Sequence, residues 1–109
     1  MLKLLDRLKK LLLLGEFMKK VVQVVPREDF KVYVYFEDGK IKLYDMKNFI
    51  GKGVFAPLAD IKIFKEKCTV MNYTLAWDLT GKRDEFDCLD IDPCSIYEYG
   101  IDIEDPFAK

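Results

Sequence analysis

Hydrophobic and polar residues alternate along the segment from Phe30 to Phe36, where every second side chain is apolar and the others are Lys or Tyr. A period of two is typical of a β-strand with one buried face. Residues 40–44 alternate in the same way, and Asp38-Gly39 separates the two segments. Asp-Gly favours a two-residue type I′ turn, in which both central residues have positive φ. The sequence therefore predicts a β-hairpin between residues 30 and 44.

A different periodicity marks the first 17 residues. Their leucines recur at helical spacing, and the basic residues fall mainly on the opposite side. The stripe consists of Leu2, Leu5, Leu8 and Leu12, widened by Leu4 and Leu11. Gly15 suits a helix C-cap. We therefore expect an amphipathic helix over residues 1–17.

This leucine-rich helix has three interpretations. It can lie on an anionic membrane, or its stripe can be buried against a second subunit or against the open face of the sheet. Burial is favoured because Phe17 is its one aromatic residue and a bare stripe promotes aggregation. A third hypothesis concerns the gene: codons for Gly15-Glu16 can resemble a ribosome-binding sequence shortly before Met18. Native translation would then start at Met18, and residues 1–17 would be a non-native extension.

The remaining elements are shorter. Residues 21–25 are rich in valine and end before a proline, which predicts a strand. Residues 48–60 contain Gly and Pro and are expected to form a loop with one or two short helical turns. Further strands are expected at residues 68–72 and 73–79. Pro93 suits the start of a short helical turn.

These elements predict an α+β fold. We expect a small antiparallel sheet of four to five strands with short helices, preceded by the N-terminal amphipathic helix, because no strand-helix-strand repeat demands parallel pairing. The chain has 109 residues, half of them hydrophobic, which is enough for one core. Residues 18–109 are accordingly predicted to form a single domain with an acidic C-terminal segment.

Charge is distributed unevenly along the chain. The net charge is -1, yet the first 20 residues carry six basic and two acidic side chains. The segment from residue 84 onward carries nine acidic side chains against one lysine. Its acidic residues are Asp84, Glu85, Asp87, Asp90, Asp92, Glu98, Asp102, Glu104 and Asp105. A basic head and an acidic tail favour a role for electrostatics in partner choice.

The cysteines predict a reducing environment rather than a disulfide framework. Cys68, Cys88 and Cys94 are odd in number and irregularly spaced. A signal-peptide cleavage site and an 18-residue apolar run are both missing from the sequence. We therefore expect a cytoplasmic protein without a membrane span.

No metal or cofactor site is predicted. The chain has no histidine, which excludes Ser-His and Cys-His catalytic arrangements and removes the commonest metal ligand. The spacing of Cys88 and Cys94 is too long for a zinc knuckle. Asp90 to Pro93 lacks the turn glycine and terminal glutamate of a calcium loop. Nucleic acid is an unlikely partner because the acidic segment repels phosphates, although lysines and tyrosines alternate along the hairpin.

Several short motifs follow one another in a fixed order along the chain. In sequence they are Val22-x-x-Val25-Pro26, Phe30-x-Val32-x-Val34-x-Phe36-x-Asp38-Gly39, Phe55-x-x-Leu58-x-Asp60 with Phe64, Ala76-Trp77 and Leu89-Asp90-Ile91-Asp92-Pro93-x-x-Ile96-Tyr97. Together they resemble the bacterial family of proteins of unknown function DUF2442. The resemblance covers residues 18–97 and rests on the ordered combination of motifs rather than on any one of them.

This resemblance implies a small α+β fold and little chemistry, because the family has no established activity. Some members look like companions of small toxin-like proteins encoded next to them, and others are fused to helix-turn-helix domains. This chain has no helix-turn-helix segment, so a repressor role does not carry over. Residues 80–88 are also longer and more acidic than the usual link in the family.

The preferred hypothesis is a protein-interaction module, of which an antitoxin-like companion of a basic partner is one form. Its candidate partner-binding residues are Asp84, Glu85, Asp87, Asp90, Asp92, Tyr97 and Trp77. One alternative is a small-ligand-binding or enzymatic domain that uses Asp90, Asp92 and Tyr97 near Trp77, although Asp92 before Pro93 is also a good helix N-cap. The other is a structural homodimer joined by the N-terminal helix.

Overall fold

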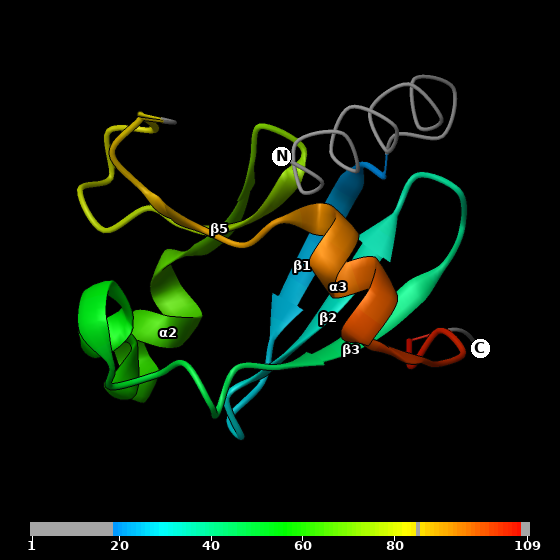
Figure 1. Ribbon diagram of the computed structural model, residues 1–109, viewed down its shortest axis with the longest axis horizontal. Coiled ribbons are helices and arrows are strands. Elements are labelled where there is room, and N and C mark those ends of the chain that lie inside the picture. Colours follow the sequence, from blue (N-terminus) through cyan, green and yellow to red (C-terminus); the bar gives the residue numbers. More distant parts are fainter. Residues whose placement is uncertain (1–18, 85, 108–109) are drawn as a thin grey trace, which may run out of the picture.

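The computed structural model describes residues 19–84 and 86–107. Two antiparallel sheets and short helices form the fold (Figure 1). The expected N-terminal helix lies outside the described residues, and with it the leucine stripe of residues 2–12. No helix in the described ranges is long and apolar enough to cross a membrane.

The larger sheet contains the predicted hairpin. Its four strands, in the order β1-β2-β3-β7, are β1 (Val21–Pro26), β2 (Lys31–Phe36), β3 (Ile41–Asp45) and β7 (Ile101–Asp102). All neighbouring strands are antiparallel. The period of two in the sequence places Val32, Val34 and Phe36 on the buried face. The fourth strand comes from the far end of the chain, so the acidic segment completes this sheet.

The smaller sheet follows two short helices. The 3-10 helix η1 (Gly53–Ala59) occupies the region where short helical turns were expected, and helix α2 (Ile61–Lys67) comes directly after it. The strands β4 (Cys68–Met71), β5 (Thr74–Trp77) and β6 (Leu89–Asp90) then pair in the order β4-β5-β6. Figure 1 shows β5 between α2 and the larger sheet.

Helix α3 (Pro93–Tyr99) begins as the sequence predicts. Asp92 is its N-cap and accepts a hydrogen bond from the Cys94 amide at 3.1 Å, while the proline that follows needs no amide partner. Figure 1 shows α3 lying over the larger sheet, and its one fully buried residue is Ile96. Gly100 ends the helix so close to β3 that a Cβ atom would lie 2.9 Å from the Cβ of Lys42.

The hydrophobic core lies between the two sheets and the helices. Its residues are Val21, Val32, Val34, Phe36, Tyr44, Met46, Leu58, Phe64, Leu75, Trp77 and Ile96. Trp77 and Phe64 are completely buried, with ring centroids 5.4 Å apart. The indole N–H of Trp77 donates to the carbonyl of Phe64 at 3.0 Å, so the tryptophan is satisfied without water.

The α+β class is confirmed, but the details of the sheets differ from the prediction. The described residues form seven strands in two sheets in place of the expected four or five in one, because the acidic segment supplies β6 and β7. The regular helix at residues 61–67 was not predicted. Its N-cap, Asp60, accepts a hydrogen bond from the Lys62 amide at 3.0 Å, and Asp before an apolar segment is the signal that marks it.

The turn at Asp38-Gly39 is not of the expected type I′. Gly39 has φ of +91°, but Asp38 does not have positive φ. Residues 37–39 form a three-residue loop in which the Gly39 amide donates to the carbonyl of Phe36 at 3.0 Å. A three-residue loop of this kind ends with glycine in the left-handed region. The two-residue turn with both φ values positive lies instead at Asn72 and Tyr73, with 50° and 58°.

Candidate functional site

The loop between β5 and β6 carries the first part of the acidic segment. Asp78 shapes its start: one carboxylate oxygen accepts from the Gly81 amide at 3.1 Å, and the other from the Arg83 amide at 2.9 Å. The Arg83 guanidinium then reaches β4, where it donates to Thr69 Oγ1 at 3.1 Å and to the Val70 carbonyl at 2.9 Å. The base of the loop is therefore fixed to the smaller sheet.

Carboxylates gather beyond this base. Burial first, and then the charges of Asp90, Asp78, Asp84 and Asp87, raise the pKa of the Cys88 thiol. Four carboxylates thus act on one thiol. Asp84, Asp87 and Asp90 are exposed, and within the described residues none of these three forms an ion pair with a basic side chain. The segment that carries Asp84, Asp87 and Asp90 is called the acidic loop below. Its negative charges are not paired with basic side chains of the described residues.

A large aromatic side chain lies in the acidic loop. Phe86 is 92% exposed, more than any other exposed large hydrophobic residue of the described ranges. Its amide donates to Asp84 Oδ1 at 2.9 Å, and the Asp87 amide donates to the Asp84 carbonyl at 3.0 Å. These two hydrogen bonds form a tight turn that presents the ring to solvent. Glu85, predicted for the same surface, lies outside the described residues.

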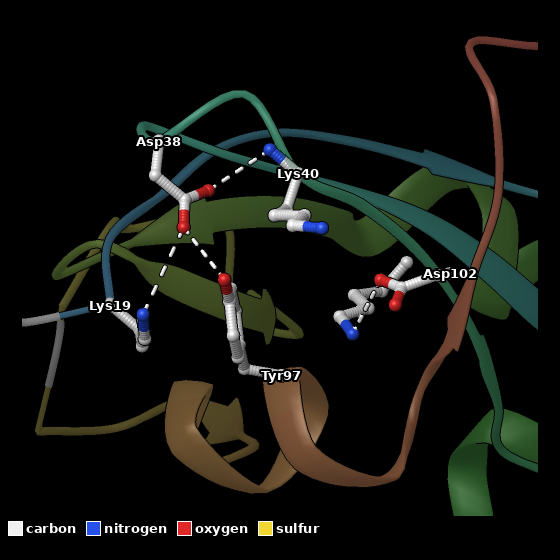
Figure 2. A network of polar contacts seen from close by, with 6 residues as sticks. Lys19, Asp38, Lys40, Tyr97 and Asp102 are labelled. Atoms are coloured by element: carbon white, nitrogen blue, oxygen red, sulfur yellow. Dashed lines mark hydrogen bonds and ion pairs between the residues drawn. The ribbon is translucent and has the colours of Figure 1, made fainter.

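A second group of polar residues surrounds Tyr97 on α3 (Figure 2). The phenol O–H donates to Asp38 Oδ2 at 2.8 Å, and the Lys19 Nζ atom lies 3.8 Å from the same oxygen. The Nζ atoms of Lys19 and Lys42 lie 3.9 and 4.8 Å from the Tyr97 ring centroid. The edge-to-face contact between Tyr97 and Phe36, at 5.0 Å, anchors the ring on the core. This group is called the Tyr97 network.

The Tyr97 network has the opposite electrostatic character to the acidic loop. Partial burial of Asp38 opposes its charge, but hydrogen bonds from the Lys40 amide and Tyr97, with the charge of Lys19, lower its pKa overall. The hydrogen bond to Asp38 raises the pKa of Tyr97. The hydrogen bond from Lys42, at 2.6 Å, lowers the pKa of Asp102. Each carboxylate here has a cation beside it, so the network holds its charges in place.

The structure separates the predicted site residues. Asp90 belongs to the acidic loop, and Tyr97 bonds Asp38 rather than a carboxylate of the acidic segment. Asp92 serves as the N-cap of α3. Trp77 is completely buried and therefore cannot belong to an exposed partner surface. The arrangement expected for an enzymatic site of Asp90, Asp92 and Tyr97 near Trp77 has no geometric support among these contacts.

Possible metal ligands do not gather at one place in the described part of the chain. The described residues contain no group of three or more His, Cys, Asp or Glu side chains that could hold a metal ion. Cys68 is largely buried among apolar residues, which raises the pKa of its thiol to about 12. A thiol in that setting packs as a small apolar side chain.

Comparison with known proteins gives one result that decides the family. The family described as protein of unknown function DUF2442 matches residues 21–102. The chain belongs to this family. No curated protein and no solved structure shows significant similarity to it.

Two motifs that lie far apart in the segment matched by DUF2442 meet in the fold. Asp38-Gly39 lies at the tip of the β2–β3 hairpin and Ile96-Tyr97 on α3, yet the Tyr97 phenol meets the Asp38 carboxylate. Ile96 is fully buried beneath the same helix. Sequence analysis had assigned Tyr97 to a partner surface and did not connect it with Asp38. A pair formed by residues 59 positions apart gives no local signal in one sequence.

Proposed function

We propose that this DUF2442 protein is a protein-interaction module that binds a basic partner through the acidic loop. The observation that carries the proposal is the exposed ring of Phe86 among three exposed carboxylates that form no ion pair with a basic side chain of the described residues. Protein interfaces combine an aromatic anchor with surrounding polar groups, and complementary charges speed the encounter. A partner surface with a small apolar pocket bordered by Lys or Arg fits this loop.

The fixed base of the loop supports a binding role. The Arg83 amide donates to Asp78 and the Arg83 guanidinium donates to the Val70 carbonyl of β4, so the start of the loop is held in place before a partner arrives. A pre-ordered surface loses less conformational entropy on binding. An antitoxin-like role is one form of this function. It rests on the resemblance to family members that accompany toxin-like proteins.

The test is co-expression of the tagged protein with the product of the adjacent gene, followed by capture at low and high salt. We expect a complex at low salt that weakens at high salt, because screening reduces attraction between exposed charges. The double variant Asp84→Asn/Asp87→Asn should bind at least about tenfold more weakly. Phe86→Ser should have a similar effect.

Matched controls remove equal charge and apolar area elsewhere. Glu37→Gln/Glu66→Gln neutralises two exposed carboxylates on other elements, and Val54→Ser truncates an apolar residue that is 69% exposed. Both control variants should bind as the original protein does. Absence of a complex at either salt concentration, or equal loss in the controls, would rule out the acidic loop as the binding surface.

A further inference from the structure

The outer face of the larger sheet, turned away from the core, is unusually apolar. Cross-strand pairing places Val25, Tyr33, Leu43 and Ile101 in one row across all four strands. A second row contains Tyr35 and the residues paired with it, Gln23 and Ile41. An antiparallel sheet with one face on the core normally has a polar second face. This face instead offers aliphatic and aromatic side chains, which is typical of a binding surface.

Part of this face is covered by the segment after β7, residues 103–107, called the strap below. The Ile103 amide donates to the Ile41 carbonyl at 3.1 Å, which continues the pairing of β7 with β3 and holds the start of the strap against the sheet. The Tyr35 phenol then donates to Asp105 Oδ1 at 3.1 Å. Phe107 packs edge to face on Tyr33, with centroids 5.7 Å apart. One carboxylate and one ring, two residues apart, thus occupy two neighbouring tyrosines of β2.

The strap is held by few contacts. Four of its five residues are exposed, and Phe107 keeps 60% of its surface accessible although it touches Tyr33. Ile101, which lies in β7 just before the strap, is 65% exposed. Segments with little burial open at low free-energy cost. The strap can therefore leave the face while the core between the sheets stays intact.

The family match separates the face from the strap. The matched residues run from 21 to 102, so they include every strand of the face and end immediately before the strap. Tyr33 also has a contact outside the strap: the Arg27 guanidinium lies 5.3 Å from its ring centroid and donates to its hydroxyl at 3.1 Å. Because the same guanidinium is paired with the Asp29 carboxylate at 3.0 Å, it holds the Tyr33 ring in place, and the Tyr35 hydroxyl is the group that binds a carboxylate.

We propose that the outer face of the larger sheet binds an extended segment of a partner protein that carries a carboxylate and, two residues later, an aromatic ring. The strap, with Asp105 and Phe107, occupies this site in the same chain and competes with the partner. Tyr35 donates a hydrogen bond to the carboxylate of the segment. The aromatic ring of the segment packs edge to face on Tyr33, whose ring also contacts Arg27. The strap itself shows that the face accepts a carboxylate and an aromatic ring. This site is separate from the acidic loop.

Competition by the strap makes a specific demand on any partner. A tethered segment acts at an effective concentration that is about millimolar for a short linker. A free segment that makes the same contacts would therefore be excluded from the face when its concentration is below about millimolar. Weakening the strap should reveal the site, and weakening the acidic loop should leave it unchanged.

The experiment uses full-length protein and a capped synthetic peptide with the strap sequence Ile-Glu-Asp-Pro-Phe. Binding is followed by chemical-shift changes of the β2 amides during titration. We expect Phe107→Ala to bind the peptide at least about tenfold more tightly than the original protein, because the competing ring is gone. Phe86→Ser, which truncates the ring of the acidic loop, is the matched control and should bind as the original protein does.

Two further measurements keep the proposal falsifiable if a variant folds poorly. A peptide in which Phe is replaced by Ala and Asp by Asn should lose binding to the Phe107→Ala variant. Adding Tyr33→Ala to that variant should also abolish binding. Equal affinity for the original and Phe107→Ala proteins, absence of binding to both, or self-association of Phe107→Ala without peptide binding would overturn the proposal. None of these outcomes depends on the basic partner of the acidic loop.

Discussion

Two groups of carboxylates in this small protein have opposite surroundings. In the Tyr97 network, Asp38 and Asp102 each lie beside a lysine, and their pKa values are lowered. In the acidic loop, burial and then the charges of the neighbouring carboxylates raise the pKa of Cys88. Both groups draw on the acidic segment that the sequence marks as one block of negative charge.

The difference shows that net charge along a segment does not identify a binding surface. Carboxylates that are paired within the fold contribute to folding stability. Carboxylates that lie among like charges contribute instead to the free energy of binding a positively charged partner. We therefore expect substitutions in the Tyr97 network to change the free energy of unfolding. Substitutions in the acidic loop should change binding and leave stability nearly unaltered.

The largest effect is expected from Tyr97→Ala. The variant loses the contact with Phe36 and the hydrogen bond to Asp38, which should lower the free energy of unfolding by about 2 kcal/mol. Tyr97→Phe keeps the ring and should cost about 1 kcal/mol. Urea denaturation measures both. Tyr99→Ala, at a neighbouring position that is 74% exposed, should change stability by less than about 0.5 kcal/mol.

Asp38→Asn should cost about 1 kcal/mol at neutral pH, since an amide accepts a weaker hydrogen bond than a carboxylate and Asp38 is partly exposed. The pKa of Asp38 is lower in the folded protein, so its contribution is complete above the unfolded pKa of about 4 and is lost as pH falls through the folded pKa. The variant should therefore lose less stability on acidification. Urea denaturation between neutral and acidic pH would detect this, and parallel curves for both proteins would contradict it.

Neutralising the acidic loop should act in the other direction. Asp84→Asn/Asp87→Asn removes repulsion between exposed like charges and should raise the free energy of unfolding by about 0.5 kcal/mol at low salt. The gain should vanish at high salt, because screening already removes the repulsion. Thermal denaturation at two salt concentrations measures the effect. A loss of stability would mean that these carboxylates support the fold.

The smallest effect is expected at the thiols. Asp90 is the first of the charges that raise the pKa of Cys88, so Asp90→Asn should increase its rate of reaction with a disulfide reagent by about twofold near pH 8. Cys68 has a pKa of about 12 and should stay unreactive in both proteins. Mass spectrometry of the labelled cysteines distinguishes the two sites. An unchanged rate at Cys88 would place Asp90 too far away to act on it.

Local patterns predicted the parts of the fold that depend on neighbouring residues. The alternation from Phe30 to Phe36 gave the buried face of β2, and Asp92-Pro93 gave the start of α3. The type I′ turn predicted at Asp38-Gly39 was wrong, because the loop there has three residues and Gly39 alone among them has positive φ. Asn72 and Tyr73 adopt positive φ although tyrosine has no intrinsic preference for it.

The candidate site was only partly predictable for the same reason. The acidic loop could be read from composition, because its charges are contiguous in sequence. The pairing of Tyr97 with Asp38 and of Lys42 with Asp102 depends on strands and helices from opposite ends of the chain. A buried lysine on a strand that alternates Ile, Lys, Leu also gives no warning that a carboxylate residing 60 positions later will neutralise it.

The origin of β7 has a consequence for how this protein is synthesised. The β2–β3 hairpin joins neighbouring residues and can form early, whereas Ile101 and Asp102 are translated long after β3. Until they emerge from the ribosome, β3 presents an unpaired edge to other nascent chains. Ile101 and Asp102 thus close this edge late, and premature termination before residue 101 would release a product with an aggregation-prone sheet.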